Sequence, residues 1–127
     1  MSPQHIVRQA LETILSGQAS RSEIEQYIAP TYQQWVDGHQ LDYPAFLQHL
    51  ATLNQRADKM TLQIDHLIAE DKLVFSQHQV RVDKTDGGQA HYRVMALFTL
   101  QDSRIVRCEE LTYMQQGQGA DRDMGSR

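Results

Sequence analysis

The sequence contains a single cysteine, and this scarcity excludes two kinds of covalent or metal support. With Cys108 alone among 127 residues, the chain cannot form an intramolecular disulfide or a zinc site built on several thiolates. We therefore expect a fold held together by its hydrophobic core, in a reducing cytoplasmic setting.

Long hydrophobic runs are also missing. No stretch approaches the roughly 18 apolar residues of a membrane span. The first residues, Met1 to His5, lack the basic segment and the continuous apolar stretch of a secretory signal. The sequence therefore predicts neither membrane insertion nor export.

Basic charge is in deficit. Twelve Lys and Arg residues against sixteen Asp and Glu residues give a net charge of −4, which does not favour a surface that follows nucleic-acid phosphates. Hydrophobic residues at 40% and charged residues at 22% are ordinary usage for a globular protein, and 127 residues fit one domain. We expect one folded domain over residues 1–116, an irregular tail over 117–127, and no nucleic-acid partner.

The motifs of several enzyme classes are absent as well. The sequence has no Gly-rich phosphate loop, no Gly-x-Ser-x-Gly elbow, no His-Glu-x-x-His helix and no Rossmann fingerprint. It has six histidines, but no two of them have a short paired spacing such as His-x-His or His-x-x-x-His. We predict no metal site and no cofactor.

What is present in the first half of the chain predicts three helices. Apolar pairs recur every four residues over residues 2–17. A capping-box spacing at Ser20 begins a second, short helix that Pro30 closes. Asp42 can cap a third amphipathic helix, and residues 31–41 predict a partly helical connector between the second and third helices.

In the second half the hydrophobic period changes to two, which predicts strands. The expected strands span residues 60–68, 73–83, 90–100 and 105–114. Their short connections cannot hold parallel crossovers, so we expect an antiparallel meander. The prediction is an α+β domain in which three N-terminal helices pack on a strongly curved antiparallel sheet of four strands.

Three histidines are candidates for a site beneath the helices. Strand alternation places His66 and His78 on the apolar faces of the first two predicted strands, and His49 lies on or beside the apolar face of the third helix. Each alone is more simply a histidine at the core edge, bonded to a carbonyl or a water. Together they favour a polar-lined cavity, because a packed core rarely gathers imidazoles without partners.

The last predicted strand is half polar on both faces and offers a carboxylate. Glu110 shares its row with Cys108, and this row is the less charged of the two. Facing an apolar cavity would raise the pKa of Glu110 and suit it to acid/base work near neutral pH. The alternative is an exposed glutamate making ordinary contacts with Arg81 or Arg93. Cys108 is more simply a small buried residue than a nucleophile.

Aromatic residues complete the candidate set. Tyr32 and Trp35 lie in the less regular connector, where aromatic side chains can line a ligand pocket, whereas core packing is the default for Phe46. The candidate catalytic residues are Glu110, His78 and His49. The candidate ligand-binding residues are Tyr32, Trp35, Phe46, His66 and Cys108.

Three segments carry a resemblance to a known family. They are Tyr32-Gln33-Gln34-Trp35-Val36-Asp37-Gly38, Leu41-Asp42-Tyr43 continuing through Phe46 to His49, and residues 98–106. In this order, with helices before strands, the chain resembles the SnoaL-like branch of the nuclear-transport-factor-2-like superfamily over about residues 4–115. Residues 108–112 and 123–127 are also similar to a small bacterial group within that branch.

The resemblance implies a cone-shaped α+β barrel with a cavity at its open end, and a homodimer formed through the outer face of the sheet. The family includes ketosteroid isomerases, polyketide cyclases, epoxide hydrolases and dehydratases, as well as binding modules without chemistry, so fold does not fix the reaction. We expect a small-molecule pocket protein for an apolar or carbonyl-bearing metabolite, either as a binding protein or as an enzyme of acid/base type. The alternative is a non-catalytic dimeric binding or assembly module.

Overall fold

The N-terminal helices begin at the capping residues that the sequence offers. In the computed structural model, which describes residues 1–126, α1 (Pro3–Ile14) follows Ser2, whose hydroxyl accepts from the His5 N–H at 3.2 Å. A reciprocal capping box at Ser20 begins α2 (Arg21–Glu25), and Asp42 caps α3 (Tyr43–Arg56). Side-chain oxygens thus satisfy free backbone donors in the first turn of each helix.

The connector expected to be partly helical is instead a β-hairpin. Strand β1 (Ile28–Val36) pairs antiparallel with β2 (His39–Asp42). Asp37 and Gly38 have φ values of 49° and 90°, the positive pair that a tight two-residue hairpin turn requires. The predicted second helix therefore ends well before Pro30, and the prediction for residues 31–41 was wrong.

The remaining strands form the predicted antiparallel meander. They are β3 (Ala57–Glu70), β4 (Leu73–Lys84), β5 (Gln89–Gln101) and β6 (Arg104–Gln116). The complete sheet has six strands in the order β2-β1-β6-β5-β4-β3. It is mixed, because β1 runs parallel to β6. The α+β class is confirmed, but the expectation of four purely antiparallel strands was wrong, since β1 and β6 are joined only by a long crossover.

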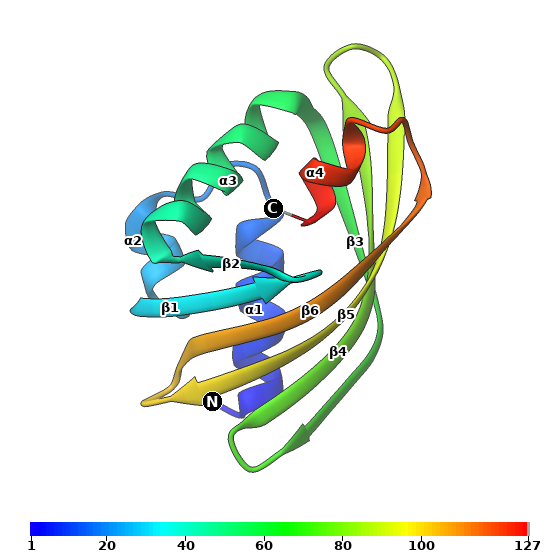
Figure 1. Cartoon of the computed structure of the whole chain (residues 1–127). Coiled ribbons are helices and arrows are strands. Elements are labelled where there is room, and N and C mark those ends of the chain that lie inside the picture. Colours follow the sequence, from blue (N-terminus) through cyan, green and yellow to red (C-terminus); the bar gives the residue numbers. More distant parts are fainter. Residues whose placement is uncertain (127) are drawn as a thin grey trace.

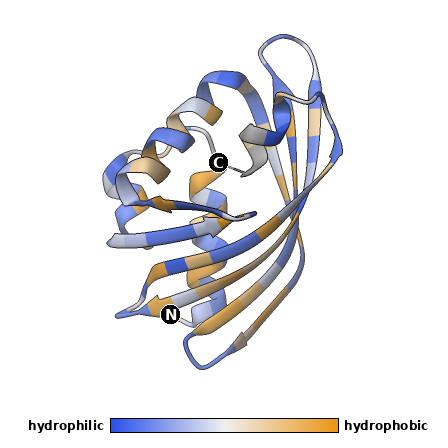
Figure 2. Ribbon diagram, in the orientation of Figure 1, coloured by the Kyte–Doolittle hydropathy of each residue, from blue (hydrophilic) through white to orange (hydrophobic). Residues whose placement is uncertain are grey.

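The strongly curved sheet packs its concave face against the helices (Figure 1). Hydrophobic and hydrophilic residues alternate along the strands (Figure 2), as a sheet with one buried face requires. On β4 the buried row is the predicted one, including Val74, Ser76, His78 and Val80. Among the described helices, none is long and apolar enough to cross a membrane.

The C-terminal segment, expected to be irregular from residue 117, forms a short helix, α4 (Asp121–Ser126). Its first residue anchors it: the Asp121 carboxylate lies 3.0 Å from Lys84 Nζ and 3.0 Å from Arg56 Nη2, and only 1% of its side chain is exposed. The Tyr92 hydroxyl donates to the Asp121 carbonyl. The expectation of a wholly irregular tail was wrong, because a single buried carboxylate holds this segment in place. The segment has no hydrophobic period from which a helix could be predicted. Arg127 lies outside the described residues.

Ionisation of Asp121 is maintained in spite of its burial. Burial alone would raise the pKa of this carboxyl, but the Gln118 N–H, the Lys84 ammonium and the Arg56 guanidinium outweigh it and hold the pKa below its ordinary value. The anchor of α4 is therefore a charged group compensated on several sides.

Candidate functional site

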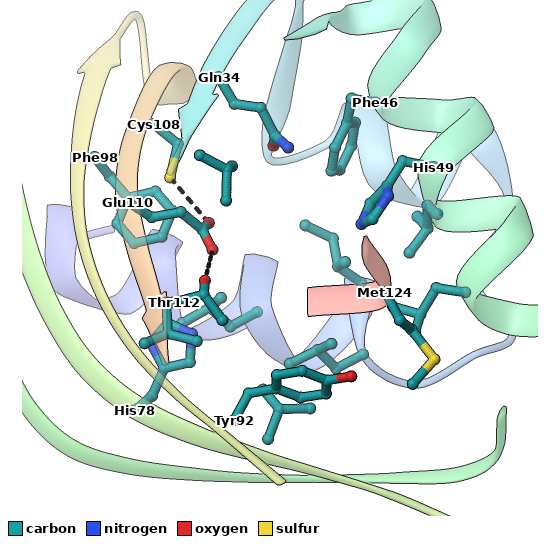
Figure 3. Close-up of a pocket in the computed structure, with 18 of the residues that line it drawn as sticks. Gln34, Phe46, His49, His78, Tyr92, Phe98, Cys108, Glu110, Thr112 and Met124 are labelled. Atoms are coloured by element: carbon teal, nitrogen blue, oxygen red, sulfur yellow. Dashed lines mark hydrogen bonds between the residues drawn. The ribbon is translucent and has the colours of Figure 1, made fainter. Parts of the chain in front are cut away.

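A cavity of about 130 Å³ lies between the concave face of the sheet and the helices (Figure 3). Twelve of its lining residues are apolar, and they come from helices and strands alike. The polar lining residues are Tyr32, Gln34, His49, His78, Tyr92, Cys108, Glu110 and Thr112. Mostly apolar walls with a few convergent polar groups are typical of small-molecule sites.

The volume of the cavity limits its occupant. An apolar cavity of roughly 150 Å³ holds one benzene molecule, so a cavity of about 130 Å³ suits a molecule of about one ring. Met124 of α4 lines this cavity and also a neighbouring depression lined by Gln48, Thr52 and Arg56. The side chains of Met124, His49 and Leu53, which line both hollows, therefore form the boundary between the cavity and this outer depression.

Glu110 reaches the cavity because β6 alternates. Cys108, Glu110 and Thr112 share the inward row, and the Glu110 carboxyl accepts from Thr112 Oγ1 at 3.0 Å and from Cys108 Sγ at 3.6 Å. Burial raises the pKa of Glu110 to about 7 and the Asp37 carboxylate adds to the rise, while the two hydrogen bonds oppose it. The carboxyl is therefore divided between its neutral and charged forms near neutral pH.

The neighbouring strand β1 supplies a second polar pair. Gln34 is in register with Cys108, and Val36 with Glu110. The Tyr32 hydroxyl donates to Gln34 Oε1 at 2.8 Å within the buried wall. Burial, with Cys108 and Glu110 close by, raises the pKa of Tyr32 well above its ordinary value, and burial also raises the pKa of the Cys108 thiol. Neither group ionises near neutral pH, so Cys108 is not an activated nucleophile.

Two of the predicted histidines line the cavity. His49 projects from α3 on the side facing Glu110 (Figure 3), and burial lowers its pKa. His78 Nδ1 shares a hydrogen bond of 2.8 Å with Ser76 Oγ. Burial lowers the pKa of His78 to about 4, although the Asp65 carboxylate acts in the opposite direction. Both imidazoles are therefore neutral at neutral pH.

The structure brings together six of the eight candidate site residues around this cavity: Tyr32, Phe46, His49, His78, Cys108 and Glu110. The placements predicted for the other two were wrong. His66 is exposed because the pairing of β3 with β4 shifts between Ile64 and His66, so that a bulge reverses the alternation. Trp35 alternates with buried Gln34 and Val36 and lines a separate polar depression with Gln40 and Arg107.

Sequence reasoning missed Gln34, Thr112, Tyr92 and Met124 as lining residues. A signal existed for the first two: Gln34 lies two residues after Tyr32, and Thr112 two after Glu110, so strand alternation puts each pair on one face. In the part of the chain that the structure describes, no group of three or more His, Cys, Asp or Glu side chains is placed to hold a metal ion.

Similarity to solved structures supports the fold. IdmH, a candidate polyketide cyclase from Streptomyces antibioticus, is 18% identical with a TM-score of 0.73, over 91% of this chain and 93% of that one. AclR, a candidate hydroxylase from Streptomyces galilaeus, is 12% identical with a TM-score of 0.73, over 88% and 77%. These identities show a shared fold and leave the chemistry open.

Similarity also extends to a curated sequence and to a family model. An uncharacterized protein of Schizosaccharomyces pombe, C11D3.04c, is 24% identical over 120 residues, covering 94% of this chain and 92% of its own length. Since this relative is from a fission yeast, the similarity to a bacterial group stays a prediction. The model described as the SnoaL-like domain matches residues 7–108. The chain therefore belongs to the SnoaL-like domain family, on the curved α+β fold of its nuclear-transport-factor-2-like neighbours.

Proposed function

We propose that this chain is a cytoplasmic protein that binds a small apolar, carbonyl-bearing molecule in its cavity and exchanges a proton with it through Glu110. The observation that carries the proposal is one carboxyl with a pKa of about 7 on the wall of a mostly apolar cavity of about 130 Å³. The buried free thiol of Cys108 agrees with a reducing compartment.

The environment of Glu110 suits it to either direction of proton transfer. A carboxyl with a pKa near the working pH is a donor in its neutral form and an acceptor in its charged form. Isomerase, cyclase, hydrolase and dehydratase reactions each move a proton at or beside an oxygen-bearing carbon. The candidate polyketide cyclase among the structural neighbours agrees with a cyclase-type reaction on this fold. His49, neutral and across from Glu110, offers a second exchange group.

Binding of a ketone is the first test. Cyclohexanone fits one ring and its carbonyl accepts a hydrogen bond from the neutral carboxyl, so only the protonated form of Glu110 binds it well. With a pKa of about 7, the protonated fraction falls from about 0.9 to about 0.1 between pH 6 and pH 8. We expect the affinity, measured by NMR titration of backbone amides, to fall about tenfold over this range.

Variants separate this explanation from a general effect of pH. Glu110→Gln keeps a neutral donor, so its affinity for cyclohexanone should not change between pH 6 and pH 8. Glu109→Gln is the matched control, because Glu109 pairs with Arg107 and does not line the cavity; it should follow the wild type. A pH-independent affinity in the wild type, or no shift at cavity residues, would refute the proposal.

A second candidate function is assembly through the outer face of the sheet. Leu111 and Tyr113 on β6 are 58% and 68% exposed, and Met95 lies in register with Leu111 on β5. Such a row of exposed apolar side chains on neighbouring strands is typical of a protein interface. The face also carries Gln77 of β4 and Arg93 of β5.

The oligomeric state tests this second function. We expect a homodimer at micromolar concentration in sedimentation equilibrium, and a monomer for Leu111→Lys, because a lysine would be buried without a partner in the interface. Gln55→Lys on α3, an exposed residue on the helical side of the molecule, is the control that should leave the dimer intact. A monomeric wild type would contradict assembly, whereas Glu110→Gln should leave the oligomeric state unchanged under either function.

A further inference from the structure

We propose that the cavity takes an uncharged compound of one six-membered ring that carries two oxygen functions, one facing Glu110 of β6 and the other within reach of His49 of α3 and the Gln34 amide of the neighbouring β1. This inference rests on the function proposed above, since it describes the ligand of the same cavity. Three features of the cavity lead to it: an unused amide donor, an unpaired imidazole, and the absence of cationic lining.

The unused donor is the amide nitrogen of Gln34. The side chain is only 8% exposed, and its Oε1 accepts from the buried Tyr32 hydroxyl. Because the Tyr32 hydroxyl needs an acceptor, the Gln34 amide is oriented with Oε1 toward the hydroxyl and Nε2 away from it. Within residues 1–126, Nε2 makes no hydrogen bond, and the amide points into the cavity toward Phe46 (Figure 3). A donor without a protein partner at the wall of a mostly apolar cavity favours a ligand that accepts from it.

The unpaired imidazole is that of His49, close to Phe46 on α3. Its ring is directed into the cavity from the side opposite Glu110 (Figure 3), and among the described residues it has no hydrogen-bond partner. A neutral imidazole offers one donor and one acceptor. The polar groups available to a ligand thus lie at two places. One is Glu110 on β6, and the other is formed by His49 of α3 with the Gln34 amide, which comes from the neighbouring strand β1 and is directed toward α3.

Charge and size set the class of the compound. Among the described residues, no Lys or Arg lines the cavity, and the nearby Lys84 and Arg56 are paired with Asp121. A carboxylate or phosphate would lose its hydration without gaining a counter-charge. The apolar walls between the two polar places fit a hydrocarbon ring, and about 130 Å³ accommodates one ring.

A series of four compounds tests the inference by NMR titration at pH 6. The probe is 1,4-cyclohexanedione, and its match is cyclohexanone, which lacks the second oxygen. The anionic control is 4-oxocyclohexanecarboxylate, and the two-ring control is 1-decalone. We expect the diketone to bind roughly three- to tenfold more tightly than cyclohexanone, the gain from one neutral hydrogen bond. The anion and the two-ring ketone should bind more weakly than cyclohexanone.

Variants assign the gain to Gln34. In Tyr32→Phe/Gln34→Met the amide is gone and no tyrosine hydroxyl is left without its acceptor, so the two ketones should bind equally. Tyr32→Phe alone keeps Gln34 and should keep the preference for the diketone. Each variant is first checked for a cooperative unfolding transition, and a pair that fails to fold is replaced by Gln34→Leu.

The outcomes distinguish this inference from the proposed function. Equal affinity of the wild type for the diketone and cyclohexanone overturns the inference, as does tight binding of the anion or the two-ring ketone. If cyclohexanone still binds with the expected pH dependence in that case, the function of Glu110 stands. If neither ketone shifts a cavity resonance, the proposed function fails and this inference fails with it.

Discussion

Replacing Asp121 by alanine is expected to lower the free energy of unfolding by about 3 to 5 kcal/mol, the effect of removing one partner from a buried ion pair. Asp121 is 1% exposed and Lys84 is 7% exposed, and their charged atoms lie 3.0 Å apart. Without the carboxylate, the Lys84 ammonium keeps, among the side chains that the structure describes, the exposed Asp86 at 3.7 Å. Arg56 also loses its partner.

The measurement is urea denaturation at neutral pH. Glu12→Ala is the control: this carboxylate is exposed on the helix α1, so its removal should change stability by less than about 0.5 kcal/mol. Lys84→Met combined with Asp121→Leu removes both buried charges and should recover much of the loss. An Asp121→Ala protein within 1 kcal/mol of the wild type, by the scale of such losses, would show that α4 is not held by this carboxylate.

The second large effect is a change in how stability depends on pH when Glu110 is replaced by glutamine. The folded carboxyl has a pKa of about 7 against 4.5 for the unperturbed group. Because the folded state holds this proton more tightly, the stabilisation is complete below about pH 4.5 and is lost as the pH rises through 7. At 1.36 kcal/mol per pKa unit, the free energy of unfolding of Glu110→Gln, relative to that of the wild type, should rise by about 3 kcal/mol between pH 4 and pH 8.

His78 acts in the opposite direction over much of the same range. Its folded pKa is about 4 against 6.5, so its contribution is complete above pH 6.5 and is lost as the pH falls toward 4. In the wild type the effects of Glu110 and His78 on the free energy of unfolding offset each other between about pH 4.5 and 6.5. In Glu110→Gln only the effect of His78 remains, so the free energy of unfolding should rise with pH over this range. Chemical denaturation at several pH values measures this; a constant difference between variant and wild type would mean that Glu110 titrates normally.

The parts of the fold that the sequence predicts well are those set by neighbouring residues. The helix over residues 2–17 and the meander from β3 to β6 follow from capping residues, hydrophobic period and short turns. His78 reaches the cavity for the same reason, since it continues a row of apolar side chains on β4. Glu110 was placed by the row that it shares with Cys108 on β6, although both faces of that strand are half polar.

What the sequence did not show depends on contacts between distant segments. The position of His66 is decided by one bulge against β4, which a count of alternating residues cannot locate. The strand β1 is stabilised by pairing with β6, which lies about 75 residues later in the chain. The Thr112 N–H of β6 also donates to the Asp37 carboxylate at 2.9 Å. The anchoring of α4 depends on Lys84 and Arg56, which lie on other elements.

The parallel pairing of β1 with β6 also bears on how the protein is made. In the order of the sheet β1 lies between β2 and β6, and a two-stranded hairpin on its own is marginal in water. A nascent chain on the ribosome therefore carries β1 as an unprotected strand edge until nearly all of its residues have been translated. The hairpin of β1 and β2 therefore takes its place in the sheet only after β6 has been made, so the first strand of the chain is among the last to be paired.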